Sequence, residues 1–200
     1  MGLNYSYILM IDKAERANLQ SLIEKRCQRH KGESREYLMI DLPLDDAISM
    51  YLREDIQRDE GLKFRNTLFF KKSKYRDHFP TDQTGRIGAI TFELLEDTHQ
   101  TFAIFMAVST RISYLFLDSK SVRDWFIQLS KDTHAMATFI DLEDMEDMGC
   151  RFVYKNNEVA DILIKEGNAT NDTECLAIHE QYLRLVEEQD RLLYGEPEQE

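Results

Sequence analysis

The sequence twice places short apolar runs on both sides of a segment with helical periodicity, and this pattern limits the folds open to the chain. In the first copy, residues 6–12 (SYILMID) and 38–42 (LMIDL) flank the periodic segment. In the second copy, the flanking runs are residues 113–118 (SYLFLD) and 138–142 (TFIDL). A short continuous apolar run is typical of a buried strand, and a period of three to four residues is typical of an amphipathic helix. The pattern predicts two strand–helix–strand units, related either by internal duplication or by chance similarity of two common motifs.

Each predicted unit carries a candidate cap for its helix. Asp12 precedes Glu15 by three residues, and Ser121 precedes Asp124 by the same spacing, as in a capping box. If the units are duplicates, we expect Asp12 and Asp118 each to cap the first turn of the following helix or to lie within about one turn of doing so.

The remaining segments predict further strands and a terminal helix. Residues 87–95 and 101–108 read as a hairpin, and residues 173–193 read as a helix with one apolar stripe. Weaker patterns predict strands over 65–70 and 151–154, a short helix over 158–165 and a loop over 71–85. The fold class that follows is α+β: a mixed β-sheet with helices on one face and a C-terminal helix folded back across it.

The length of 200 residues suits one domain over residues 1–200. The alternative is an N-terminal lobe over 1–75 and a C-terminal lobe over 86–200. An apolar fraction of 42% is a globular value. The only tryptophan, Trp125, shares a helical stripe with other apolar side chains, so we expect it in the core; those side chains are Val122, Phe126 and Leu129.

The location of the protein is predicted from its cysteines and its apolar runs. The three cysteines, Cys27, Cys150 and Cys175, are far apart and odd in number, which favours a reducing compartment. We find no apolar run long enough to span a membrane and no secretion signal. A cytoplasmic protein is therefore expected.

The formal net charge of −12 is concentrated at the C-terminal end. Residues 141–200 contain 17 acidic and 5 basic residues, which accounts for the whole imbalance. An acidic protein is repelled by nucleic acid and by anionic membrane surfaces, and it attracts basic proteins. The acidic run that follows residues 138–140 is the candidate partner-binding site: Asp141, Glu143, Asp144, Glu146 and Asp147.

Searches for catalytic and cofactor motifs give no linear signature. No glycine-rich phosphate loop follows a strand, so no nucleotide cofactor is predicted. Cys175 and His179 share a helix face and could supply two metal ligands, but the sequence shows no third or fourth, so no metal is predicted. Cys150, with His134 as a conceivable base, is most simply a small buried residue.

Two functions stay open at this point. The first is a non-enzymatic, acidic binding protein, inhibitor- or immunity-like, that docks on a basic protein partner. The second is an enzyme whose site is assembled from scattered residues. A deep pocket with convergent polar groups would favour the enzyme, and a shallow acidic face would favour the binding protein.

Overall fold

A computed structural model describes residues 4–32, 35–60, 78–142, 149–159 and 173–194. The predicted strand over 65–70 and the basic part of the predicted loop, residues 71–76, lie outside these ranges.

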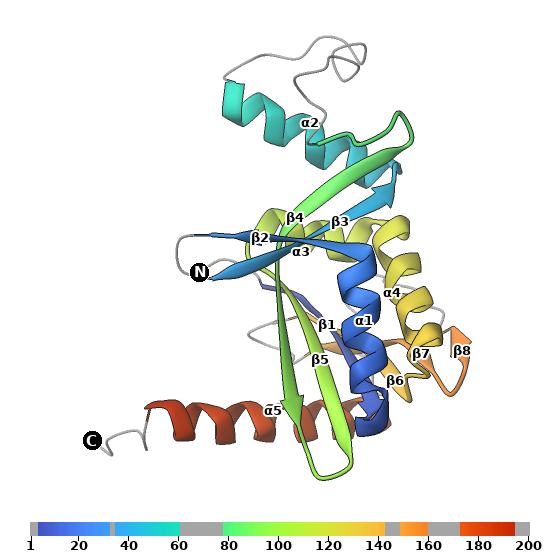
Figure 1. Ribbon diagram of the computed structural model, residues 1–200, viewed down its shortest axis with the longest axis vertical. Helices are drawn as coiled ribbons and strands as arrows, with labels where there is room; N and C mark the ends of the chain where they lie inside the picture. Colours follow the sequence, from blue (N-terminus) through green and yellow to red (C-terminus); the bar gives the residue numbers. More distant parts are fainter. Residues whose placement is uncertain (1–3, 33–34, 61–77, 143–148, 160–172, 195–200) are drawn as a thin grey trace.

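One eight-stranded antiparallel sheet runs through the described residues (Figure 1). Its spatial order is β2-β3-β4-β5-β1-β6-β7-β8. The strands are β1 Ser6–Asp12, β2 Cys27–Lys31, β3 Glu36–Pro43, β4 Thr84–Glu96, β5 Gln100–Ala107, β6 Ala137–Asp141, β7 Cys150–Lys155 and β8 Glu158–Val159. The α+β class is confirmed. Every neighbouring pair of strands is antiparallel, so the expectation of a mixed sheet is corrected in this respect.

Helices cover both faces of the sheet. They are α1 Arg16–Arg26, which follows a short 3-10 turn over Lys13–Glu15, α2 Asp46–Glu60, α3 Thr110–Asp118, α4 Lys120–Asp132 and α5 Thr173–Tyr194. The first four pack into one large core, as predicted for one face of the sheet, and α5 packs into a second core on the other face. In Figure 1, α2 lies at one end of the long axis and α5 at the other.

Strand β1 explains why both faces must be covered. Its residues from Ser6 to Ile11 are all buried, as expected for a continuous apolar run at the centre of a sheet. Side chains alternate along a strand, so Tyr7 and Leu9 join the core beneath the first four helices, and Ile8 joins the core beneath α5.

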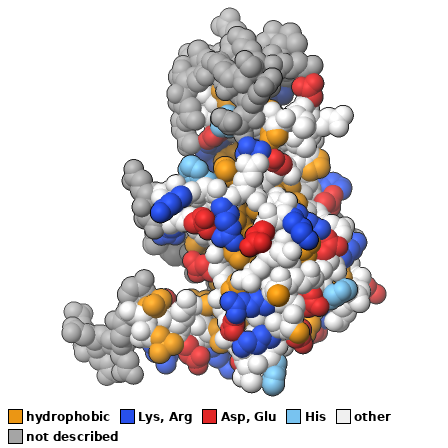
Figure 2. Space-filling view, viewed as in Figure 1, with side chains coloured by type: hydrophobic (Ala, Val, Ile, Leu, Met, Phe, Trp, Pro, Cys, Tyr) orange, Lys and Arg blue, Asp and Glu red, His pale blue; other side chains and the backbone are white. Residues whose placement is uncertain are grey.

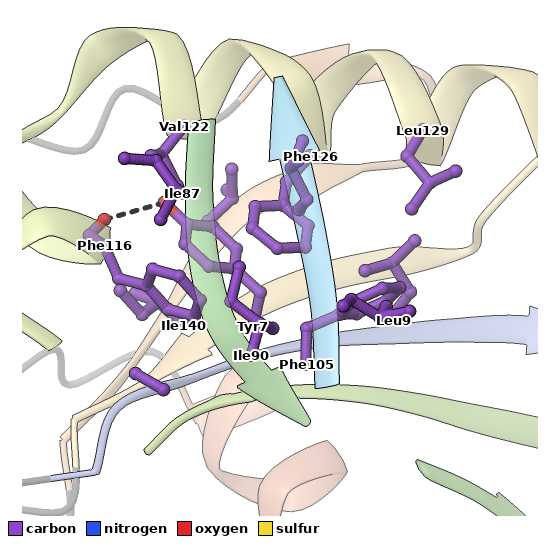
Figure 3. Packing of buried hydrophobic residues seen from close by; sticks show 14 of the residues in the cluster. Tyr7, Leu9, Ile87, Ile90, Phe105, Phe116, Val122, Phe126, Leu129 and Ile140 are labelled. Carbon is purple, nitrogen blue, oxygen red and sulfur yellow. Dashed lines mark hydrogen bonds between the residues drawn. The ribbon is translucent and has the colours of Figure 1, made fainter. Parts of the chain in front are cut away.

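Aromatic rings fill the larger core (Figure 3). The ring of Phe126 on α4 stacks on that of Tyr7 with centroids 3.9 Å apart. The Tyr7 hydroxyl donates a 3.1 Å hydrogen bond to the carbonyl oxygen of Phe116, near the end of α3. Burial raises the pKa of Tyr7, so its hydroxyl stays protonated. Trp125 is partly buried against this core, less than the sequence predicted.

The predicted strand over residues 113–118 is wrong, because this segment lies in helix α3. The Ser109 side chain accepts a 3.4 Å hydrogen bond from the Ile112 amide and so caps the helix. Ile112, Leu115 and Phe116 are buried at helical spacing, whereas Tyr114 between them is exposed. The second unit is thus helix–helix–strand, and it does not repeat the first.

The first unit also differs from its prediction. Residues 6–12 and 38–42 do form strands, but β5 and β4 lie between them in the sheet. The segment Cys27–Lys31, which follows helix α1 within this unit, forms edge strand β2.

The two predicted helix caps have different outcomes. Asp12 is confirmed as a cap, since its side chain accepts a 2.8 Å hydrogen bond from the Ala14 amide. Asp118 is the last residue of α3 and does not cap α4, although it lies within one turn of the helix start, next to Ser119. Ser119 caps α4 instead of Ser121.

The predicted hairpin is confirmed: β4 and β5 are joined through residues 97–99, where the Asp97 amide donates to the Gln100 carbonyl at 2.9 Å. The C-terminal helix is confirmed as α5. Residues 158–159, predicted as helix, form strand β8.

The number of domains stays a prediction. In the described part of the chain, no helix is both long and apolar enough to cross a membrane.

Candidate functional site

The side chain of Arg111 stands at the centre of a concave region between α2 and α3. Its guanidinium donates hydrogen bonds of 2.9 Å to Asp55 Oδ1 and of 2.9 Å to the Tyr51 carbonyl oxygen. It also lies 4.8 Å from the centre of the Tyr51 ring, a cation–π distance. The Ser109 cap fixes the start of α3 and therefore the place of Arg111 on its first turn. Arg111 lies between two hollows and lines both of them.

The larger hollow is a cavity of about 860 Å³ between strands β3 and β4 and helices α2 and α3. Its polar lining includes Arg111, Arg86, His30, His78 and Ser109. Arg86 binds both carboxylate oxygens of a side chain on β3, Asp41, at 2.6 and 2.8 Å. This volume falls in the range of small-molecule pockets.

An irregularity in β4 shapes this cavity. Ala89 has a φ of 55°, in the left-handed region that residues other than glycine rarely adopt. The pairing register between β3 and β4 shifts between Leu38 and Ile40, opposite this position. This irregularity is a β-bulge in β4. Ala89 lines the cavity, so the bulge bends β4 where the strand forms the cavity wall.

The smaller hollow is a groove of about 210 Å³ on the outer surface of α2 and α3. Met50 and Tyr114 line it and are 59% and 50% exposed, so the groove presents apolar surface to solvent. Two exposed carboxylates, Glu54 and Asp118, also line it. Arg111 forms ion pairs with Asp55 at 2.9 Å and with Glu54 at 3.5 Å. Together with Asp118, these carboxylates outnumber the one guanidinium, so the groove keeps a negative character. We call this set of residues the α2–α3 groove.

A third group of polar side chains lies on the opposite face of the sheet, beneath α5. The Cys150 and Cys175 sulfur atoms are 3.1 Å apart, and both residues are fully buried. His179, one turn beyond Cys175, has its Nε2 atom 3.3 Å from Asp141 Oδ1. This distance suits an ion pair, although within the described residues Nε2 has no well-aligned hydrogen-bond partner.

Charges in this group shift two pKa values. The hydrogen bond from Cys175 and the positive charge of His179 lower the pKa of Cys150, against the effects of burial and of Asp141. Burial opposes the charging of His179, but the nearby Asp141 carboxylate and its negative charge outweigh burial, and the pKa of His179 is raised.

Among the residues predicted from sequence as an acidic partner-binding run or as a base, the structure describes Asp141 and His134, which lie in different surroundings. Asp141 ends β6 with its side chain 19% exposed and beside His179. Glu143, Asp144, Glu146 and Asp147 lie outside the described residues, so their partner-binding role stays a prediction. The histidine whose charge acts on Cys150 is His179, whereas His134 is exposed at the end of α4.

Cys175 and His179 do share a helix face, as expected, and the structure adds that both are buried. The sequence did not reveal that Cys150 and Asp141 join them. These two are cross-strand partners at the ends of β6 and β7, so recognising that hairpin would have placed both at the site. Within the described residues, no group of three or more side chains is arranged to hold a metal ion.

The α2–α3 groove was also missed, because residues 113–118 were read as a strand.

Comparison of the chain with family models, with curated proteins and with solved structures finds no match.

Proposed function

We propose that this protein is a non-enzymatic binding protein, inhibitor- or immunity-like, that docks on a basic protein partner. The observation that carries this proposal is the α2–α3 groove, where exposed Met50 and Tyr114 lie beside the carboxylates of Glu54 and Asp118. Interfaces are enriched in tyrosine and methionine, and their strongest contacts are buried anchors surrounded by polar groups.

A lysine or arginine side chain of the partner fits the chemistry of this groove. Its aliphatic stem would pack on Met50 and Tyr114, and its charged end would meet Glu54 and Asp118. The net charge of −12 adds a long-range attraction that increases the rate of encounter with a basic protein.

On another face of the described surface, acidic and basic side chains are mixed. In the view of Figure 2, acidic and basic side chains lie next to one another over the face that carries α1, β2 and β3. Paired charges of this kind include Arg29–Glu36 and Arg16–Glu96, both at 2.5 Å. Such a face offers a basic partner little net attraction, which favours the α2–α3 groove and the acidic run as contacts.

The test is capture of basic proteins from a native lysate, followed by association kinetics with the captured partner. The groove variant combines Glu54→Lys with Asp118→Lys. A control variant, Glu188→Lys with Asp190→Lys on α5, changes the net charge by the same amount at exposed positions away from the groove. We expect the groove variant to associate about tenfold more slowly at low salt and the control to keep nearly the wild-type rate.

A third variant reverses the predicted acidic run at Glu143, Asp144, Glu146 and Asp147. Slow association of this variant alone would assign the docking to the acidic run and not to the groove. Equal rates for all variants at low salt would contradict docking by charge.

The cavity favours a second candidate, an enzyme with a site built from scattered residues. His30, His78, Arg86 and Arg111 reach it from four separate segments of the chain, and arginine is suited to binding carboxylate or phosphate groups. A thermal-shift screen with small anionic compounds tests this candidate. Stabilisation by one of them, lost in an Arg86→Ala variant, would support it.

A further inference from the structure

Two cysteines far apart in the sequence meet between β7 and α5. Cys150 is the first residue of β7, and Cys175 lies in the first turn of α5, 25 residues later. Their sulfur atoms are 3.1 Å apart, and the two residues are not joined by a disulfide in this structure. A disulfide bond is about 2.05 Å long, so the two atoms need to approach by only about 1 Å.

The surroundings of this thiol pair favour a thiolate at Cys150. Cys175 donates a hydrogen bond that stabilises the charged sulfur, and the positive charge of His179 acts in the same direction, so the pKa of Cys150 is lowered. The Asp141 carboxylate, 3.3 Å away, favours the charged form of His179. A thiolate is the reactive form of cysteine in both oxidation and disulfide exchange.

The third cysteine is an internal control. Cys27, on edge strand β2, has its pKa raised to about 12 by burial. It therefore stays a neutral thiol at physiological pH, with low reactivity.

The geometry argues against two other roles for this group. A cysteine nucleophile needs a substrate atom about 3 Å from its sulfur. Cys150 is fully buried, and the Cys175 sulfur already lies at that distance from its sulfur. This arrangement argues against Cys150 as a catalytic nucleophile. Metal binding is disfavoured because the described side chains, these four included, form no group of three or more with suitable geometry.

We propose that Cys150 and Cys175 form a reversible disulfide on reaction with a small peroxide, covalently joining β7 to α5. The Cys150 thiolate attacks one peroxide oxygen, the O–O bond breaks, and Cys150 becomes a sulfenic acid while the other oxygen leaves as water after taking up a proton. Cys175 then attacks the Cys150 sulfur. The S–O bond breaks, and the departing hydroxide takes up the proton of the Cys175 thiol as a second water. Two thiols are oxidised and one peroxide is reduced.

The experiment treats the full-length protein with hydrogen peroxide and counts thiols after denaturation. We expect the count to fall from three to one, with an intact-mass loss of about 2 Da for two hydrogens. Digestion without reductant should give a peptide that links Cys150 to Cys175, and dithiothreitol should restore all three thiols. The variant Cys27→Ser should still form the link, whereas Cys150→Ser and Cys175→Ser should not.

Three results would overturn the proposal. The first is a wild-type protein that keeps all three thiols under peroxide, and the second is a linked peptide that contains Cys27. The third is one zinc ion per chain in the freshly purified protein, since the thiols would then be metal ligands. The wild-type measurements decide the question even if a serine variant fails to fold.

Discussion

Replacing Phe126 by alanine should be among the most damaging single changes in the larger core. Phe126 is fully buried on α4, and its ring stacks on that of Tyr7 at 3.9 Å with an interplanar angle of 9°. Three more rings lie nearby, with centroid distances of 5.2 Å to Phe105, 5.8 Å to Phe116 and 4.9 Å to Trp125. The variant would remove all four ring contacts and leave a cavity. Figure 3 labels Phe126 together with Tyr7, Phe105 and Phe116.

The expected cost follows from these contacts. Phe→Ala changes in cores cost about 3–5 kcal/mol, and aromatic pairs contribute about 0.5–1.5 kcal/mol beyond the area they bury. We therefore expect a loss of about 4–5 kcal/mol, near the top of the range. For a chain of this length the melting temperature should fall by about 8–20 °C.

Urea denaturation followed by circular dichroism measures this loss. Trp125→Ala is the matched control on the same helix, and because Trp125 is only partly buried we expect a smaller loss, about 2 kcal/mol. If Phe126→Ala does not fold, Phe126→Leu keeps much of the volume and should cost about 1–2 kcal/mol. A Phe126→Ala loss under about 2 kcal/mol, or one no larger than that of Trp125→Ala, would refute this account of the core.

Three further changes test other parts of the structure. Asp45 accepts hydrogen bonds from the Ile48 amide and the Ser119 hydroxyl, and although burial opposes it, this bonding lowers the carboxyl pKa. Asp45→Asn should therefore cost about 1–2 kcal/mol at pH 7, and the loss measured in urea melts should shrink as the pH falls below about 4. The pKa of His179 is raised, so its stabilising effect is complete below about pH 6.5 and is lost as the pH rises through the folded-state pKa. His179→Gln should therefore lose more stability at pH 5.5 than at pH 8.5 in thermal melts. The single variant Asp141→Asn should reduce the pH dependence of stability that His179 causes. At Gly85 a Cβ atom would meet the Leu52 side chain at 2.6 Å, so Gly85→Ala should cost about 1–3 kcal/mol in urea melts.

The sequence predicted best the elements whose burial depends on their own residues. Strand β1 is apolar throughout because it is covered on both faces, and this was visible in residues 6–11. The same holds for α2, whose buried residues Ile48, Leu52 and Ile56 recur in the sequence at helical spacing.

The sequence failed where short segments depend on their surroundings. A run such as residues 113–118 is too short for periodicity to separate helix from strand, and the Ser109 cap that starts α3 lies outside it. Strand β2 has one buried residue followed by four exposed ones, and it is a strand because it pairs with β3.

The candidate sites were hidden for a related reason. Arg111 and Asp55 are 56 residues apart, and Cys150 and Cys175 are 25 apart, so only the fold brings each pair together. Cys175 with His179 was the exception, because both lie on one helix face four residues apart.

The two faces of the sheet differ in how firmly their helices are held, and this bears on how a buried thiol pair can react. The core beneath α1 to α4 contains many more buried apolar residues than the core beneath α5. The outer end of α5 also leaves Leu192 and Leu193 exposed, at 88% and 64%, and Figure 2 shows hydrophobic side chains at that end. Segments with fewer buried apolar contacts open locally at lower free energy than the rest of a protein. We therefore expect α5 to separate from the sheet more readily than α4. Such an opening exposes Cys150 and Cys175 to a small oxidant while the larger core stays folded.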